Sequence, residues 1–341
     1  MTGFRLRAAH ALALVAALAV LPALADAADK VSIIVGGLEK QVYLPAMLSQ
    51  RLGNFQKEGL DVELLNARAG VEAENELLAG GVQGVVGFYD HTIDMQAKGK
   101  FIQTIVQFAQ APGEVELVST KLAGEITSPA QLKGRTLGIT GLGSSTEFLT
   151  RYLAVRAGLK EGDYSLLGVG AGNTFIAGMR QGAIAAGMTT EPTISQMLKT
   201  GDAKILVDMR TPELTRAALG GTYPGASFYV QAAWVQKNPE IAARLARAFV
   251  ATLRFMATHS AEEIADQMPK DYYVGDRALY VKALADGMGQ WTRDGRMPED
   301  GPETVLKVLS AFNRGVAGKK IDLARTYTNQ FVDGALQQIA K

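Results

Sequence analysis

The sequence predicts an α/β protein of two similar lobes, each a mostly parallel sheet flanked by helices, with two hinge crossings between the lobes. Three observations predict this class. Strand-like and helix-like segments alternate along most of the chain, one block of that pattern occurs twice, and the C-terminal part is helical without a counterpart after the first block. A chain of 341 residues also has room for about two domains of ordinary size.

The duplication is visible without gaps at an offset of 102 residues. Asp61 to Asp90 aligns with Asp163 to Pro192, and each copy reads as strand, glycine-containing loop, short helix, glycine and second strand. The match extends backwards, where residues 30–55 parallel 134–159: a β-branched strand runs into a Gly-Leu turn and then a helix. Each copy is thus β-α-β-α-β, although the identities are few and chance similarity is the alternative.

The remaining elements complete the two lobes. Further strands are expected at 101–110 and 114–121 between the copies, and at 203–209 and 225–235 after the second copy. Asn238-Pro239 is a strong helix start, and more helices are expected at about 276–291, 302–313 and 322–340. The chain is expected to leave lobe one near 118–125 and to return near 222–229. Lobe one then comprises 28–120 and 225–341, and lobe two comprises 121–224, joined by a hinge.

The N-terminal residues read as a secretory signal peptide, residues 1–27. Arg5 and Arg7 precede an apolar run at 11–21, and small-residue cleavage sites follow at Ala25 and Ala27. The alternative is a buried N-terminal helix. The signal predicts a periplasmic protein, and the absence of cysteine means no disulfides.

Charge and motifs exclude several classes of function. Without residues 1–27 the chain goes from 35 basic and 34 acidic side chains to 33 of each, so no basic field attracts nucleic acid. Gly141-x-Gly143-x-x-Thr146 lacks the third glycine of a dinucleotide fingerprint, and no Walker A, G-x-S-x-G or H-E-x-x-H sequence occurs. With only His91 and His259 left, we expect no catalytic residue, no metal and no cofactor. We also expect a monomer.

Ligands of open α/β sheets bind outside the carboxyl ends of the strands. Those ends are expected at 36–41, 67–70 and 87–91 in lobe one and at 141–146, 170–173 and 189–191 in lobe two. If the lobes face each other, the six loops line one cleft. The candidate ligand-binding residues are Gly37, Lys40, Gln41, Tyr43, Arg68, Gly70, Phe88, Tyr89, His91, Gly143, Ser144, Ser145, Thr146, Asn173, Thr190 and Glu191.

Each candidate also has a purely structural interpretation. Ser144 and Glu147 form a capping-box pattern, so the helix start either attracts an anion or only caps itself. Lys40 and Arg68 could pair with an acid group or be surface charges.

The other candidates also have both a ligand-binding and a structural interpretation. The aromatic residues could form ligand walls or core, and His91 could be a solvated loop residue. Glu191 could receive an amine or simply open a helix.

The chain resembles the substrate-binding proteins of ABC importers for nitrate, sulfonates and taurine, a group that includes binding proteins for thiamine-pyrimidine precursors. The similarity rests on the order and spacing of YLPAMLSQRLGNFQKEGLDVELL, SPAQLKGRTLGI, RQGAIAAGMTTEP and NPEIAARLARAFVATLRFM. Gln83, Gln131 and Ala185 stand where the family often has Asp.

The resemblance implies a two-lobed type II periplasmic-binding-protein fold and delivery of a small-molecule ligand to an ABC permease with a cytoplasmic ATPase. It carries over best to Gln41 and Tyr43, to Ser144, Ser145 and Thr146, and to Glu191. The expected function is capture of a small organic anion, such as a sulfonate or carboxylate, with an aromatic body allowed. A periplasmic sensor subunit and a thiamine-precursor-type enzyme on the same fold are the alternatives. The identity of the ligand stays open.

Overall fold

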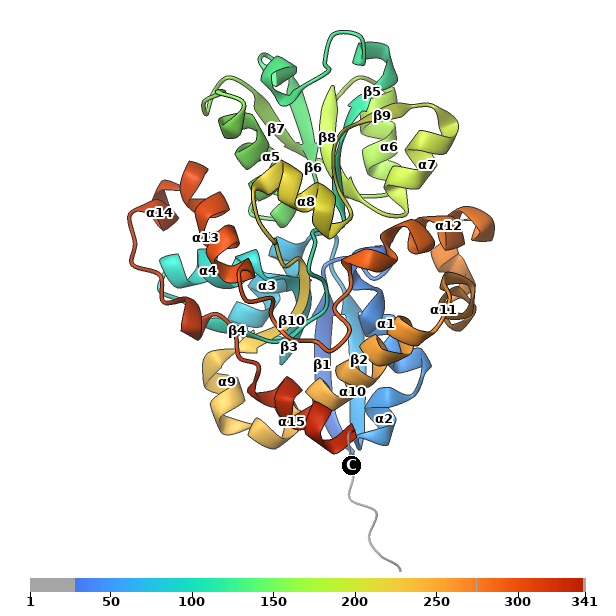
Figure 1. Cartoon of the computed structure of the whole chain (residues 1–341), viewed down its shortest axis with the longest axis vertical. Coiled ribbons are helices and arrows are strands. Elements are labelled where there is room, and N and C mark those ends of the chain that lie inside the picture. The colour runs from blue at the N-terminus through green and yellow to red at the C-terminus, as the bar shows by residue number, and fades with distance from the viewer. Residues whose placement is uncertain (1–27, 274, 340–341) are drawn as a thin grey trace, which may run out of the picture.

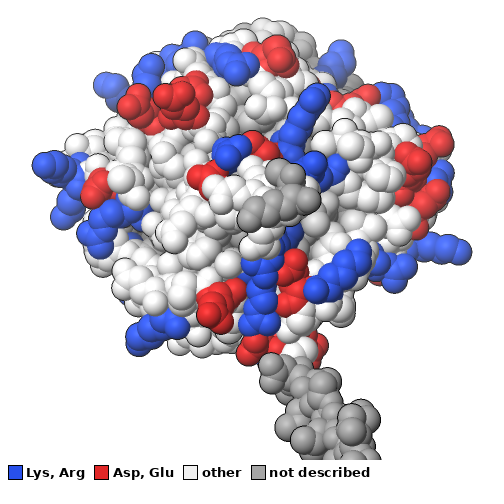
Figure 2. All heavy atoms as spheres, turned by 60° about the horizontal axis from the view of Figure 1, so that its bottom comes forward, with Lys and Arg blue, Asp and Glu red and all other residues white. Residues whose placement is uncertain are grey.

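The computed structural model describes residues 28–273 and 275–339, and it contains two lobes, each built on a five-stranded sheet (Figure 1). The expected signal peptide lies outside the described residues. Within them, no helix is both long and apolar enough to span a bilayer. On the face in Figure 2, Lys and Arg side chains are interspersed with Asp and Glu.

The first sheet has the strand order β2-β1-β3-β10-β4. Its strands are β1 (Asp29–Val35), β2 (Leu60–Asn66), β3 (Gly84–Phe88), β4 (Ile102–Gln107) and β10 (Ala226–Gln231). β1 pairs in parallel with β2 and β3, whereas β10 runs antiparallel to β3 and β4. Helices cover both faces of this sheet, so its central strands are buried on both sides and consist mostly of apolar residues.

The second sheet has the equivalent order β7-β6-β8-β5-β9. Its strands are β5 (Glu114–Ser119), β6 (Thr136–Ile139), β7 (Ser165–Gly168), β8 (Ala186–Thr190) and β9 (Ala203–Met209). Here β5 is the antiparallel strand, between β8 and β9. The shared order is what a duplication of one β-α-β-α-β unit predicts.

The helices follow the same division. Lobe one has α1 (Leu44–Arg51), α2 (Asn54–Lys57), α3 (Gly70–Ala79), α4 (Asp90–Ala97), α9 (Ala232–Lys237), α10 (Pro239–Thr258), α11 (Ala261–Gln267), α12 (Arg277–Gly287), α13 (Gly301–Phe312), α14 (Arg314–Ala317) and α15 (Gln330–Ile339). Lobe two has α5 (Ser145–Arg156), α6 (Asn173–Arg180), α7 (Thr193–Thr200) and α8 (Pro212–Leu219). Short 3-10 turns are η1 (Gln41–Tyr43), η2 (Thr120–Leu122), η3 (Pro129–Leu132), η4 (Lys270–Tyr273), η5 (Met288–Gln290) and η6 (Leu323–Arg325).

The two crossings lie at 108–113, between β4 and β5, and at 220–225, between α8 and β10. The first differs from the sequence expectation, which placed it at 118–125 and left β5 in lobe one. β5 belongs to lobe two because it pairs with β8 and β9. The crossings also touch: a Cβ at Gly225 would lie 2.7 Å from the carbonyl oxygen of Ala111, so this approach requires glycine.

The C-terminal helices bind the lobes together. α10 packs against α1, α2 and α15 within lobe one, whereas α13 contacts both α4 and α5. Val305, Val308 and Leu309 of α13 share one apolar cluster with Phe148 and Leu149 of α5, and burial of these side chains favours association of α13 with both lobes.

Candidate ligand site between the lobes

A small cavity lies where the strand-end loops of the two lobes meet. Lobe one contributes Lys40, Tyr43, Gly70 and His91 to its lining. Lobe two contributes Glu114, Thr140, Ser144, Ser145, Thr146 and Thr190. Its volume is about 10 Å³, which is room for a group the size of one water molecule. The lobes are therefore closed around this point.

The start of α5 supplies hydroxyl groups to the cavity. Thr146 Oγ1 accepts a hydrogen bond from the Thr140 amide at 3.0 Å and lies 2.8 Å from Thr140 Oγ1. Ser144 does not cap its own helix; its Oγ lies 3.4 Å from the amide of Val71 in lobe one, which donates to it. Glu147 accepts from the Gly143 amide and not from the Ser144 amide, so the expected capping box is not formed.

Asp90 links the lobes through buried hydrogen bonds. Its Oδ2 accepts from Ser145 Oγ at 2.6 Å, across the cleft, and from Tyr223 OH at 2.7 Å, on the return crossing. The residue is fully buried, and this burial raises the pKa of its carboxyl group, while its two hydroxyl donors oppose the rise. Asp90, in lobe one, thus connects that lobe both to lobe two and to the return crossing.

Lys40 folds back into lobe one rather than projecting into solvent. Only 4% of it is exposed, and its Nζ donates to the carbonyl oxygens of Gly36 and of Arg68, the latter at 3.0 Å. Gly37 makes this possible: its φ is +127°, and a Cβ there would lie 2.6 Å from Lys40 Cε. Burial lowers the pKa of Lys40 to about 8, although neighbouring carboxylates oppose that change.

Glu114 places a poorly compensated carboxyl group in the lining. Only 2% of the residue is exposed, and its Oε2 has no hydrogen-bond partner among the described residues. Burial raises its pKa well above the ordinary range and nearby Asp90 raises it further, whereas Lys40 lowers it. Glu116 lies on the same face of β5, two residues further, but does not line the cavity.

His91 lines the cavity and contacts buried residues on the side away from it. Its Nδ1 lies 3.0 Å from Tyr229 OH and 3.4 Å from Glu74 Oε2, and both neighbours are buried. Its Nε2 has no hydrogen-bond partner among the described residues. Gly70 is needed beside it, because a Cβ would come within 2.8 Å of His91 Cε1.

Half of the candidates predicted from the sequence line this cavity. They are Lys40, Tyr43, Gly70, His91, Ser144, Ser145, Thr146 and Thr190. Gly37 and Gly143 lie beside them and adopt positive φ angles. The cavity therefore brings together residues from both predicted sets of loops.

The other candidates lie elsewhere. Arg68 is on the surface, with 87% of its side chain exposed, in an ion pair with Glu72. Asn173 is exposed at the start of α6, beside a separate cavity of about 250 Å³ on the outer side of the cleft. The strand-end position of these residues was correct, but their side chains do not face the inner cavity.

Three further candidates are buried with structural partners. The Nε2 of Gln41 donates to the Tyr280 carbonyl oxygen at 3.0 Å, and the hydroxyl oxygen of Tyr89 lies 2.6 Å from Thr326 Oγ1. Phe88 packs edge-on against Tyr43.

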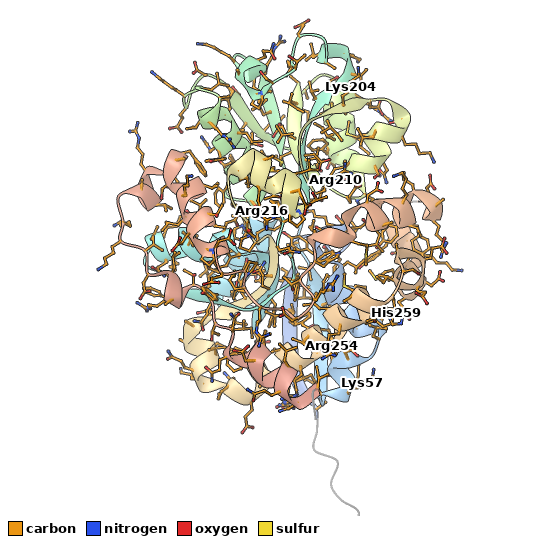
Figure 3. All side chains as sticks on the ribbon, viewed as in Figure 1. Lys57, Lys204, Arg210, Arg216, Arg254 and His259 are labelled. Carbon is orange, nitrogen blue, oxygen red and sulfur yellow. The ribbon has the colours of Figure 1, made fainter. Side chains whose placement is uncertain are left out.

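Glu191 accepts from the amide and hydroxyl of Ser195 and from Arg210, which lies near the junction of the lobes (Figure 3). Its backbone carbonyl accepts from the Gln41 amide across the cleft. The carboxylate of Glu191 is thus already compensated.

Asp90, Glu114 and Thr140 belong to the site or its surroundings but are not among the candidates predicted from the sequence. Glu114 and Glu116 alternate with Val115 and Leu117, which is the pattern of a half-exposed strand and predicts that both carboxyl groups face solvent. Asp90 was within the predicted loop 87–91 but was not selected. Thr140 lies one residue before the predicted loop 141–146.

Comparisons with known proteins agree with this architecture. The sequence model of the family described as NMT1/THI5 like matches residues 41–263. The solved structure of a protein from Bordetella bronchiseptica RB50 is 36% identical, with a TM-score of 0.87, over 92% of this chain and 98% of that chain. No curated protein matches the sequence.

Two more distant structures show the fold alone. The periplasmic nitrate-binding protein NrtA from Synechocystis PCC 6803 is 14% identical, with a TM-score of 0.69, over 91% of this chain and 89% of that one. The periplasmic aliphatic sulphonate binding protein SsuA from Escherichia coli is 18% identical, with a TM-score of 0.66, over 89% of this chain and 99% of that one. The resemblance and the fold class predicted from the sequence are confirmed: this chain belongs to the NMT1/THI5-like family and has the fold of the periplasmic binding proteins.

Proposed function

We propose that this protein is an extracytoplasmic solute-binding protein. It captures a small molecule between its lobes, as a monomer, and delivers it to an ABC permease with a cytoplasmic ATPase. The observation that carries the proposal is the cavity lined by strand-end loops of both lobes. Similarity to proteins named as nitrate- and sulphonate-binding supports it. The expected signal peptide would place it in the periplasm.

The proposed mechanism is capture by closure. A ligand that places one polar group in this cavity contacts Lys40 and Tyr43 from lobe one and Glu114 and Thr146 from lobe two only when the lobes are together. It therefore binds the closed form more tightly than the open form and shifts the population towards closure. The permease would then recognise the closed shape.

The proposed ligand is a small polar molecule. The expectation of an organic anion relied on the hydroxyl-rich start of α5 together with Lys40 and Arg68, and Arg68 lies on the surface. Lys40 uses two N–H groups on carbonyl oxygens and keeps one for an acceptor on the ligand. An anionic group at Lys40 and the start of α5 is still compatible with this arrangement, but it would share the cavity with Glu114.

The two lobes allow a direct test, because the chain has no cysteine of its own. Lys57 in lobe one and Lys204 in lobe two are both exposed and lie near opposite ends of the molecule (Figure 3). A Lys57→Cys, Lys204→Cys variant carrying a donor and an acceptor dye reports the distance between lobes. The panel is sulfonates, carboxylates, nitrate, pyrimidines and amines.

A member of the panel is expected to shorten this distance in a saturable manner and to be recovered unchanged by mass spectrometry. If no member changes the distance, the capture mechanism is wrong. If a compound that binds is recovered chemically altered, the enzyme alternative replaces it.

A further inference from the structure

We propose that the ligand presents a positively charged nitrogen bearing N–H groups to the carboxylate of Glu114. This inference rests on the proposed solute-binding function and names a chemical class for the ligand: a small ammonium or amidinium compound. It differs from the expectation of an anion, because it assigns the dominant charged contact to an acidic residue of lobe two.

The first support is an unpartnered acceptor in the cavity wall. Glu114 is 2% exposed, lines the cavity, and leaves Oε2 without a hydrogen-bond partner among the described residues. Buried carboxylate oxygens are rarely left without donors, since the loss of water is costly. An ionised carboxylate only accepts hydrogen bonds, so the group that completes it must donate.

The second support is a neighbouring oxygen in the same condition. Thr190 is the direct cross-strand partner of Glu114 in the pairing of β5 with β8, and it also lines the cavity. Its Oγ1 is buried and has no partner among the described residues. Two adjacent strands thus present two unsatisfied oxygens to the same cavity. A nitrogen with more than one N–H group can donate to both, because a hydroxyl accepts as well as donates.

The third support is the balance of charge around the cavity. Glu114 provides the carboxyl group of the lining, with buried Asp90 close by, and the basic side chains of the lining are Lys40 and His91. His91 directs its Nδ1 to Tyr229 and Glu74 instead. Lys40 already donates to two carbonyl oxygens and is not within ion-pair distance of Glu114 among the described residues. A cation beside Glu114 would give its carboxyl group a charged partner, and a terminal ammonium group is similar in size to the one water molecule that the cavity admits.

The competing possibility is that Glu114 is protonated and donates to an oxygen of the ligand. The two possibilities make opposite predictions for Glu114→Gln. Glutamine imitates the protonated acid, so it would preserve binding of an anion, but it removes the charge that a cation requires.

The experiment uses the dye-labelled full chain and two matched pairs of probes, propylammonium with propionate and benzamidinium with benzoate. We expect the cation of at least one pair to close the lobes and its anion not to. Glu114→Gln should weaken cation binding by roughly 10- to 100-fold, the worth of a hydrogen bond to a charged group.

Two further variants complete the design. Glu116→Gln removes a buried carboxyl from the same face of β5 outside the cavity lining, and should change cation binding less than about threefold. Glu114→Asp retains the charge and should still prefer the cation, which guards against a folding defect in Glu114→Gln. Circular dichroism checks the fold of each variant.

Several outcomes overturn the inference and leave the solute-binding proposal standing. The inference is wrong if an anion of the two pairs closes the lobes and neither cation does. It is also wrong if neither cation acts and the lobes close only with panel compounds that lack a charged nitrogen. Equal weakening of the cation by Glu114→Gln and Glu116→Gln also overturns it. Failure of every compound in the panel to close the lobes refutes the proposed function as well.

Discussion

Glu116 offers a measurement of burial energetics that does not depend on knowing the ligand. The residue is fully buried on β5, its Oε2 accepts from Thr150 Oγ1 at 2.8 Å, and its Oε1 has no partner among the described residues. Burial raises the pKa of Glu116 from 4.5 to about 8, and the Thr150 hydroxyl opposes the rise. We therefore expect the Glu116→Gln variant to become more stable than the wild type as the pH rises.

The magnitude follows from the two pKa values. Below pH 4.5 the carboxyl is protonated in both states. Between pH 4.5 and about 8 the unfolded chain loses the proton while the folded protein keeps it, so the wild type loses about 1.4 kcal/mol of unfolding free energy per pH unit. Glutamine does not ionise. The unfolding free energy of the variant should therefore rise by roughly 4 kcal/mol relative to that of the wild type between pH 5 and pH 8, and this difference should stay constant well above pH 8.

The assay is urea unfolding at several pH values from 5 to 8, followed by circular dichroism. Glu76→Gln, the same change at an exposed position of α3, is the control for the substitution itself. The reasoning is refuted if the difference in unfolding free energy between Glu116→Gln and the wild type is constant over this range, because Glu116 would then ionise equally in both states.

Three further substitutions test the closed arrangement. Asp90→Ala leaves two buried hydroxyl donors without their acceptor, so the equilibrium between closed and open forms should shift by about 1–3 kcal/mol towards the open form. The interlobe dye distance should then lengthen, and an unchanged distance contradicts the bridging role. Gly37→Ala places a Cβ against Lys40 at a φ of +127°, and thermal unfolding should show a loss of about 1–3 kcal/mol, which an unchanged melting temperature would disprove. Arg68→Ala removes only an exposed ion pair, so ligand affinity by calorimetry should stay within about 0.5 kcal/mol of the wild type, and a larger loss would return Arg68 to the site.

The order of strands and helices could be predicted from the sequence because it depends on local patterns. Asn238-Pro239 marks the start of α10 at Pro239, as expected. The helix expected at 276–291 ends at Gly287, and the one expected at 322–340 begins as α15 only at Gln330. The first crossing was misplaced because the sequence of β5 shows a strand but not its partners, which lie 67 or more residues further along the chain.

The site was predictable as a set of loops but not as a set of side chains. Lys40 and Arg68 both follow strands and look alike in sequence, yet one is buried and the other is on the surface. The difference arises from Gly37, whose conformation lets Lys40 fold back, and from Glu72, which pairs with Arg68 one helical turn away. Such packing involves neighbours that a sequence pattern does not identify.

The exchange of antiparallel strands between the two halves of the chain has a consequence for biogenesis. Lobe two is one contiguous stretch, from β5 to α8, and has all its strands as soon as residue 219 has emerged. In lobe one, β10 sits between β3 and β4, so β4 has no partner in its own sheet until residues 226–231 arrive. A nascent or newly exported chain must therefore keep the first half unfinished, with open strand edges, while the second half is already complete.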